Sequence, residues 1–163
     1  MVRQLKMVWK VSNRPQVSTL PEGYKLRSYH ESDKNQYITL MEKSGFTDFH
    51  TIIDNVLKNP LSPTGIFFVT YEDTLVATAC ALEKDKQSAE LGWVAVDPEH
   101  RGKKLSLVTC TSVINFLLDK KYNEIFLLTD HWRTAAIKIY LKLGFEPVHD
   151  SAADRFLWAD FSE

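Results

Sequence analysis

The sequence predicts an α/β fold in which helices flank a mixed β-sheet. Between residues 66 and 96, three β-branched and aromatic segments follow one another with short turns between them, as in an antiparallel meander. From residue 103 onward, two apolar helical patterns surround one buried strand, and such alternation adds a βαβ-like half to the sheet. The length of 163 residues is about that of one domain, so we expect a single α/β domain over 1–163.

The first sixty residues are expected to hold an irregular lead-in and two helices. Acidic residues at 31 and 33 favour a helix start because they complement the N-terminal end of the helix dipole, and Gly45 ends that helix. Asn59-Pro60 ends the next one. The expected elements are an edge strand over 5–11, a proline-containing lead-in over 12–23, a strand over 24–29, and helices over 31–45 and 48–58.

The rest of the chain contains the elements that define the fold class. Glu72-Asp73 and Asp97-Pro98 mark turns, and Gly144 is expected to cap a helix. The helix after residue 103 is apolar over much of its circumference, which is typical of a helix packed on a sheet. The expected elements are strands over 66–69, 75–82 and 91–96, a helix over 103–120, a strand over 125–129, a helix over 134–143, and a last strand over 155–160.

Composition and charge argue against several classes of protein. The net charge of −1 and the lack of a basic stripe disfavour nucleic-acid binding. No apolar run approaches the roughly 18 residues that span a bilayer, and the N-terminus lacks a secretory h-region, so we expect a cytoplasmic protein without a membrane segment. Cys80, Cys110 and the five histidines show no metal-ligand spacing, so we expect buried inert thiols and no metal. A homodimer is among the assemblies that the sequence allows.

The junction between residues 94 and 106 is the most informative part of the chain. A strand runs into a short basic loop, and the loop opens a helix whose first N–H groups lack intrahelical partners. Together with the helix dipole, these groups make an anion site suited to phosphates. Arg101, Lys103 and Lys104 add positive charge, and Gly102 lets the backbone approach a ligand closely. Taken alone, the junction is also compatible with a solvated basic turn.

This junction resembles the acetyl-CoA-binding motif of the GNAT superfamily of N-acetyltransferases. The positions that match the family pattern V-x-P-x-x-R-G-x-G-x-G/A are Val96, Pro98, Arg101 and Gly102. Lys104 stands at the second glycine of the pattern, and Ser106 stands at its final glycine or alanine. Because residues in a first helical turn have a negative φ, we expect Lys104 to fit without strain, with its ammonium near the phosphates.

A second segment, residues 127–145, resembles the strand and helix that come next in the family, with the pattern N-x-x-A-x-x-x-Y-x-x-x-G-F. The matching positions are Ala136, Tyr140, Gly144 and Phe145. Arg133 stands where the family has its asparagine. The two segments keep the order and the separation that the family shows.

The resemblance implies a GNAT acyl-CoA N-acyltransferase fold with acetyl-CoA as cosubstrate. Loop amides would hold the pyrophosphate, and the pantetheine arm would lie along the main chain of the strand, as in β-addition. The residues implied in cofactor binding are Val94, Ala95, Val96, Arg101, Gly102, Lys103, Lys104, Leu105, Ser106 and Arg133. The implied division is a lead-in over 1–22, acceptor-side helices over 24–60, a CoA-binding core over 65–145 and a C-terminal strand over 146–163.

Tyr140 and Glu90 are the candidate catalytic residues. In the family, this tyrosine lies near the CoA sulfur and is proposed to protonate the departing thiolate, and a phenol with a pKa of about 10 is protonated at neutral pH. The alternative is a core tyrosine, because Tyr140 shares a helix stripe with Ala136 and Leu143. Glu90 falls in the strand where several family members carry a glutamate, which could deprotonate the amine. The alternative is a solvent-facing glutamate at the strand end.

Three residues at the end of the following strand are further candidates. Asp130 and His131 are alternative bases because open α/β sheets bind ligands at this edge, although such residues are more often loop residues or helix caps. Trp132 lies beside the same edge and is a candidate for lining the acceptor pocket.

The sequence therefore predicts an enzyme that moves an acetyl group from acetyl-CoA to a primary amine of a small molecule or peptide. No serine or cysteine at the junction looks like an activated nucleophile, so we expect direct transfer in a ternary complex. The departures at Lys104, Ser106 and Arg133 keep one alternative open, a non-catalytic acyl-CoA-binding module of the same fold.

Overall fold

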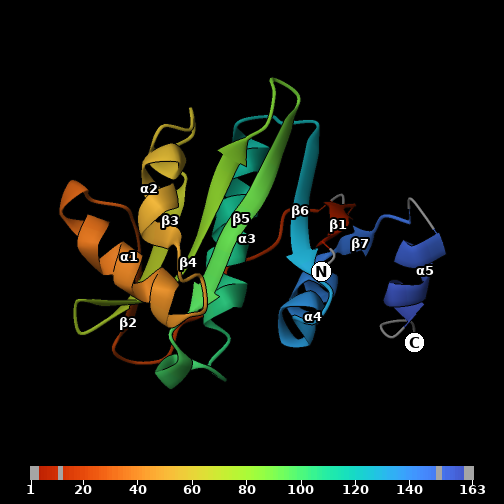
Figure 1. The fold of residues 1–163 in the computed structure, drawn as a ribbon. Coiled ribbons are helices and arrows are strands. Elements are labelled where there is room, and N and C mark those ends of the chain that lie inside the picture. Colours follow the sequence, from red (N-terminus) through yellow and green to blue (C-terminus); the bar gives the residue numbers. More distant parts are fainter. Residues whose placement is uncertain (1–3, 11–12, 150–151, 160–163) are drawn as a thin grey trace.

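The predicted mixed sheet is confirmed by the computed structural model, which describes residues 4–10, 13–149 and 152–159 (Figure 1). Val11, Ser12 and Asp160, which the predicted segments included, lie outside these residues. The described strands form one seven-stranded sheet in the order β2-β3-β4-β5-β6-β1-β7. The strands are β1 (Gln4–Trp9), β2 (Tyr24–Ser28), β3 (Ile66–Tyr71), β4 (Thr74–Glu83), β5 (Ser88–Val96), β6 (Glu124–Asp130) and β7 (Phe145–Pro147).

Strands β3, β4 and β5 form the predicted antiparallel meander, and β2 extends it by one strand. Each pairs antiparallel with the next, and β3 and β4 are joined by a tight turn at Glu72 and Asp73. Both turn residues have a positive φ, 48° and 68°, which is the geometry that suits a two-residue hairpin. Strand β6 then adds to β5 in the parallel direction, which makes the sheet mixed.

Strand β1 lies inside the sheet, so its prediction as an edge strand was wrong. It pairs antiparallel with β6 on one side and with β7 on the other. Leu5 and Met7 are almost fully buried, and the Trp9 indole donates a hydrogen bond to the Leu143 carbonyl at 3.0 Å. The alternation of buried and more exposed residues along β1 explains the placement, because the buried side chains enter the main core.

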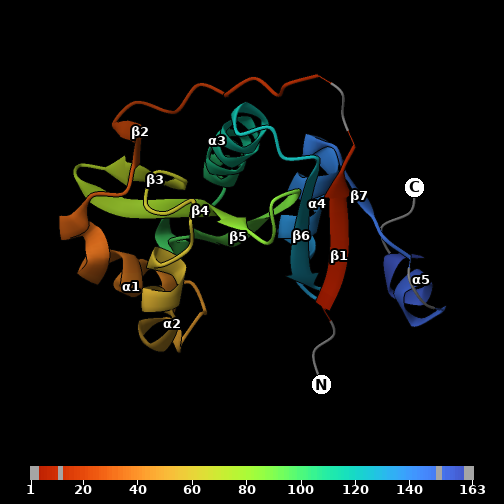
Figure 2. The ribbon, with the colours of Figure 1, turned by 90° about the horizontal axis from the view of Figure 1, so that it is seen from above.

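The helices cover both faces of the sheet. Helices α1 (Lys34–Lys43) and α2 (Phe49–Leu57) lie on one face, and α3 (Leu105–Asp119) lies on the opposite face (Figure 2). Two short 3₁₀ turns, Glu31–Asp33 and Pro98–His100, precede α1 and the loop before α3. Helix α4 (Thr134–Leu143) ends at Gly144, which has a φ of 107° as the predicted cap requires. None of the described helices is long and apolar enough to cross a bilayer.

The C-terminal segment forms helix α5 (Ala152–Trp158), so the strand predicted over 155–160 was wrong. Strand β7 ends at Pro147, and the sheet gains no further described strand after it. The segment AADRFLW suits a helix because it opens with two alanines and carries an acidic residue in its first turn and a basic one in its last. Trp158 is 2% exposed and belongs to the main hydrophobic core.

The core is divided by the sheet. On one face, aromatic and aliphatic side chains of α1 and α2 pack on β3, β4 and β5, with Tyr37, Phe49 and Phe68 fully buried. The main cluster joins α3 and α4 to β1, β6 and β7. The two clusters hold β5 from both sides, and that strand positions the site.

Candidate active site

Strands β5 and β6 separate soon after they begin. The parallel pairing runs only from Ser88 to Glu90 on β5, opposite Glu124 to Phe126 on β6. Past Glu90, β5 stays paired with β4 but carries a bulge, where Trp93 and Val94 stand opposite the single residue Ala79. Trp93 takes a positive φ of 50° in this bulge. Because a bulge bends its strand, the sheet is open between the C-terminal halves of β5 and β6.

Helix α3 begins beside this opening. After β5 the chain makes a short 3₁₀ turn, Pro98–His100, and a loop that contains Gly102 with a φ of 82°. The helix starts at Leu105, two residues later than predicted. Its first N–H groups and the positive end of its dipole therefore lie next to the loop, where an anion is favoured.

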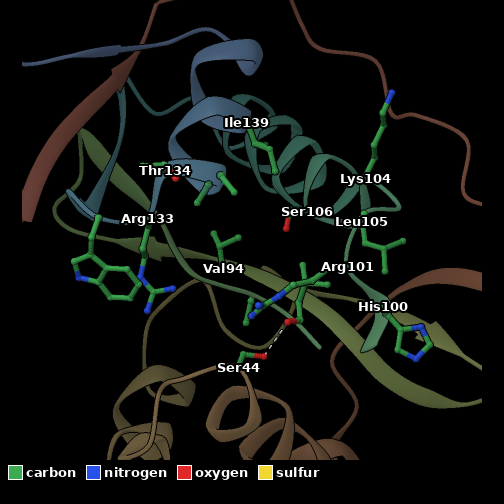
Figure 3. Close-up of a pocket in the computed structure, with 16 residues that line it drawn as sticks. Ser44, Val94, His100, Arg101, Lys104, Leu105, Ser106, Arg133, Thr134 and Ile139 are labelled. Carbon is green, nitrogen blue, oxygen red and sulfur yellow. Dashed lines mark hydrogen bonds between the residues drawn. The ribbon is translucent and has the colours of Figure 1, made fainter. Parts of the chain in front are cut away.

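A cavity of about 410 Å³ lies between β5, the start of α3 and the start of α4 (Figure 3). Nine of the ten residues implied in cofactor binding line it: Val94, Ala95, Val96, Arg101, Gly102, Lys104, Leu105, Ser106 and Arg133. Lys103 is exposed and is not among the lining residues. The structure thus brings the strand, the basic loop and the α3 N-terminus together around one cavity.

Lys104 adopts a left-handed conformation, so the expectation of an unstrained first-turn lysine was wrong. Its φ is 62° and its ψ is 29°, and it occupies the N-cap position of α3. The residue precedes the first helical turn, where the negative φ begins. The chain therefore keeps the backbone shape that suits a glycine at the second glycine position of the motif, with a lysine in its place.

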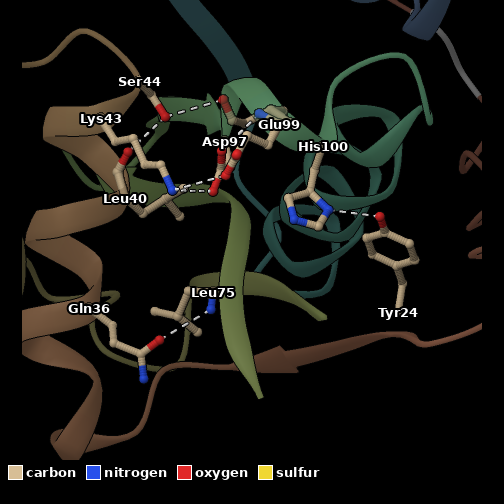
Figure 4. A network of polar contacts seen from close by, with 10 residues as sticks. Tyr24, Gln36, Leu40, Lys43, Ser44, Leu75, Asp97, Glu99 and His100 are labelled. Atoms are coloured by element: carbon tan, nitrogen blue, oxygen red, sulfur yellow. Dashed lines mark hydrogen bonds and ion pairs between the residues drawn. The ribbon is translucent and has the colours of Figure 1, made fainter. Parts of the chain in front are cut away.

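Polar contacts join the segment between β5 and α3 to α1 and to β2 (Figure 4). The Lys43 ammonium at the end of α1 lies 2.8 Å from the Asp97 carboxylate, and the Glu99 N–H donates to the same side chain at 2.9 Å. Burial alone would raise the pKa of Asp97, but these hydrogen bonds lower it overall. On the other side of the loop, the Tyr24 hydroxyl and His100 Nδ1 lie 2.7 Å apart.

A second cavity, of about 380 Å³, adjoins the first between β5, β6 and α4. It contains both candidate catalytic residues, Glu90 and Tyr140, together with Asp130. Val94, Arg133 and Ala136 line both cavities, so the two spaces meet along β5 and the start of α4. The aromatic and aliphatic part of the second lining consists of Phe46, Leu82, Leu91, Trp93, Val94, Leu128, Ala136 and Tyr140.

The protonation of Glu90 and Tyr140 is governed by burial. Desolvation raises the pKa of Glu90 above its ordinary value of 4.5, and the positive charge of Lys84 opposes that shift. Burial raises the pKa of Tyr140 well above 10.0, with a smaller rise from Cys110 and an opposing effect of Arg133. Tyr140 therefore stays a neutral phenol at physiological pH.

The remaining predicted residues divide between the cavities and the surroundings. Asp130 lines the second cavity, whereas His131 is not among the residues that line either space. Trp132 lines the first cavity and is 55% exposed. Cys80 and Cys110 are fully buried, as predicted. Among the described residues, no group of three histidine, cysteine or acidic side chains is arranged to hold a metal ion.

Several lining residues were not predicted. Ser44 and Phe46 follow α1, and Gln4 comes from β1, so each reaches the cavities from a distant part of the sequence. The Ser44 hydroxyl donates to the Val96 carbonyl at 3.2 Å, directly beside the first cavity. Of these unpredicted lining residues, only Thr134 and Ala135 could have been found from the sequence. They begin the helix that follows the carboxyl end of β6, where open α/β sheets bind ligands.

Comparison with known proteins shows which family the chain resembles. The sequence model of the acetyltransferase (GNAT) family matches residues 26–145, which include both cavities except for the contribution of β1. N-acetyltransferase 8 of Rattus norvegicus is 28% identical over 116 residues, covering 67% of this chain and 52% of that protein. Mycothiol acetyltransferase of Rhodococcus erythropolis is 25% identical over 167 residues, covering 91% of this chain and 56% of that protein. The chain thus spans about half the length of these curated relatives.

Solved structures share the fold. A GCN5-related N-acetyltransferase from Sphaerobacter thermophilus superposes with a TM-score of 0.71 at 19% sequence identity, over 91% of this chain and 50% of that one. At that identity the likeness concerns the fold, and it extends beyond the residues that the family sequence model matches.

Proposed function

Because the chain belongs to the GNAT family of acetyltransferases, we propose that it transfers an acetyl group from acetyl-CoA to a primary amine of a small molecule or peptide. The observation that carries the proposal is the meeting of two cavities along Val94, Arg133 and Ala136. One cavity has the features of a phosphate and pantetheine site, and the other holds a carboxylate and a neutral phenol.

The first cavity suits acetyl-CoA. The N–H groups at the start of α3, with Arg101 and Lys104 beside them, would bind the pyrophosphate. The lining segment Val94 to Val96 would lie along the pantetheine arm, because the opening between β5 and β6 leaves main-chain groups there accessible to an added strand. Acetyl-CoA supplies the activated thioester, and the protein supplies its position.

The second cavity would receive the amine. Glu90 would take a proton from the acceptor ammonium, directly or through a water molecule, so that the nitrogen lone pair can attack the thioester carbonyl. A C–N bond forms and the C–S bond breaks. Tyr140, which burial keeps protonated, would give its proton to the departing thiolate. It would be reprotonated through solvent by the second proton, which the substrate nitrogen loses as the neutral amide forms. Transfer is direct, since Cys80 and Cys110 are buried inert thiols and neither lines a cavity.

A comparison of Tyr140→Phe with the wild type tests this proposal. Acetyl-CoA should raise the melting temperature of both proteins by mass action, because the phenol is not part of the phosphate site. The variant should release CoA thiol with a panel of primary amines roughly 10²–10⁴-fold more slowly than the wild type. Absence of a melting shift in the wild type would contradict the cofactor assignment. A shift without turnover of any amine would favour the acyl-CoA-binding module instead.

A further inference from the structure

Arg133 lies where the two cavities meet. It lines both of them, and it is the one charged residue that the two linings share among the described residues. The residue is the N-cap of α4 and lies three positions after Asp130, the last residue of β6. Its side chain is 25% exposed, so a ligand in either cavity can reach it.

The guanidinium of Arg133 is held in place on three sides. Its central carbon lies 4.6 Å from the ring centres of both Phe46 and Trp132, as in paired cation–π contacts. Its Nε donates to the Asp130 carboxylate at a long 3.4 Å. Within the described part of the chain, its two terminal nitrogens donate no hydrogen bond. A planar, oriented fork of free donors is the arrangement that binds a carboxylate in a bidentate manner.

In the proposed site, the phosphates of acetyl-CoA would lie at the end of the first cavity that is remote from these free donors. Figure 3 shows Arg133 at one end of the cavity and Lys104, with the start of α3, at the other. The anion site of the helix N-terminus is therefore remote from Arg133, and the pantetheine arm between them carries no charge. An anionic group that reaches Arg133 has to come from the reacting end of the complex.

The charges of the second cavity match a zwitterion. Glu90 and Asp130 favour an ammonium group, and Arg133 favours an anion. Phe46, Trp93 and other apolar side chains form the rest of the lining and suit a hydrophobic substituent. These features together describe a molecule that has an amine, a nearby carboxylate and an apolar part.

We propose that the acceptor is an amino acid, or a molecule with an amino-acid head group, whose carboxylate is bound by Arg133 next to the reacting amine. The inference rests on the proposed acetyl transfer and names the acceptor class for it. Arg133 is assigned to the acceptor, whereas Arg101, Lys104 and the start of α3 remain the proposed phosphate site.

Matched acceptors test the assignment. With saturating acetyl-CoA, kcat/KM is measured for L-phenylalanine, L-phenylalaninamide and phenethylamine, and for the corresponding leucine series. The free acids should be preferred by roughly 10- to 100-fold, the size of a charge-assisted hydrogen-bond pair. The amine of each amide is less basic than the amine of the corresponding acid, so more of it is in the reactive, unprotonated form. This difference alone would favour the amides, opposite to the expected preference. A preference for the acids therefore reports recognition of the carboxylate.

Variants locate the preference. Arg133→Gln should abolish the difference between acid and amide while the KM for acetyl-CoA stays near that of the wild type. Arg133→Lys should keep part of it, because an ammonium retains the charge without the fork. Arg14→Gln, which removes an exposed arginine paired with Asp119, is the matched control and should keep the full preference. A raised KM for acetyl-CoA in Arg133→Gln, with the acid preference intact, would assign Arg133 to the cofactor and overturn the inference.

The same assay separates the two sources of a carboxylate. Succinyl-CoA is compared with acetyl-CoA on phenethylamine, and a preference for succinyl-CoA that Arg133→Gln removes would place the anion on the acyl group and overturn the acceptor assignment. If acetyl-CoA raises the melting temperature while only amines that lack a carboxylate are acetylated, the inference fails and the cofactor assignment stands. If acetyl-CoA neither binds nor reacts, the proposed function itself fails.

Discussion

Lys104 keeps a backbone conformation that a side chain makes costly. Left-handed geometry disfavours a residue with a Cβ by roughly 1–2 kcal/mol, and the φ of 62° lies at the centre of that region. The cost is tolerated at the mouth of the proposed phosphate site, where the Lys104 side chain extends away from the other lining residues (Figure 3). The sequence pattern shows that a glycine of the motif is replaced by Lys104. It does not show the backbone conformation of Lys104, because that conformation depends on the residue at which α3 begins.

We expect Lys104→Gly to stabilise the protein. Relief of the left-handed strain should exceed the extra chain entropy of glycine, for a net gain of about 0.5–1 kcal/mol in the free energy of unfolding. Urea denaturation followed by circular dichroism measures it. Lys103→Gly is the control and should destabilise, since Lys103 is not among the residues with a positive φ. An equal effect of the two substitutions would contradict the assigned conformation.

Gly102 provides the reverse case in the same loop. Its φ of 82° favours glycine, while a Cβ added there would meet no atom within 4 Å. Gly102→Ala should therefore destabilise through backbone strain alone, by about 1 kcal/mol. The melting temperature without ligand measures this effect. A substitution without cost would mean that the loop relaxes to another shape.

Glu90 should set the acidic limb of the pH profile. Its pKa is raised above 4.5 by burial, and the ionised form that acts as a base exists only above that raised pKa. The kcat/KM of the wild type should thus fall as the pH is lowered toward the pKa of Glu90. Glu90→Gln should lose roughly 10²-fold at neutral pH and recover part of the loss at high pH, where the amine is already free. Glu146→Gln, exposed on β7, should behave as the wild type.

Residues around the first cavity were easier to predict than residues around the second. Most of the first cavity is lined by one continuous segment, residues 94–106, in which a strand, a loop and a helix start lie next to one another in sequence and in space. The second cavity combines Gln4, Phe46, Glu90 and Tyr140, which come from four separate elements or loops. Periodicity and spacing describe neighbours along the chain, and they carry no information on which distant side chains meet across a sheet.

At the scale of elements, β1 is the part that sequence reasoning misplaced. A short apolar segment ahead of a proline-containing lead-in is typical of an edge strand, because the neighbouring sequence does not indicate which strands pair with it. Its neighbours, β6 and β7, lie at the other end of the chain and leave room for one antiparallel strand between them. Helix α5 was misread for a related reason, since its short apolar run suits a strand or a helix equally.

Met7→Ala tests the central position of β1. Met7 is fully buried between two strands, so its truncation should lower the free energy of unfolding by about 2–5 kcal/mol, as for other core methionines. Lys6→Ala is the control on the same strand, because the Lys6 side chain is 38% exposed and should matter little. Equal, small effects of both would place β1 outside the core.

At the scale of the whole molecule, two buried carboxylates connect the helical layer of α1 to the sheet. Asp97 links the end of β5 to Lys43 of α1, and Asp33 binds the Arg27 guanidinium of β2 through both oxygens, at 2.7 and 2.8 Å. The pKa of Asp33 is lowered mainly by the Arg27 hydrogen bond, against the effect of burial. Both pairs hold α1 against the sheet.

These carboxylates should make the protein sensitive to acid. A lowered pKa means that the unfolded state takes up protons first as the pH falls below the ordinary value of 3.8, so the stabilisation present at neutral pH is lost on acidification through the folded-state pKa. Urea denaturation at pH 6 and pH 3 should show a marked loss of stability. Asp33→Asn should be destabilised at pH 6 and should lose less on acidification. Asp119→Asn, exposed on α3, should retain the wild-type pH dependence.

The position of β1 also bears on how the chain folds. Trp9 and Leu143 are in contact but are 134 residues apart in sequence, and β1 pairs on both sides with strands from the C-terminal half. During synthesis, β1 is made well before β6 and β7, so its apolar face stays unpaired until those strands emerge. Contacts this distant are entropically costly to close, which slows folding. The meander and α3 can therefore form before β1 inserts, and the second cavity, which Gln4 helps to line, is complete only once β1 has joined the sheet.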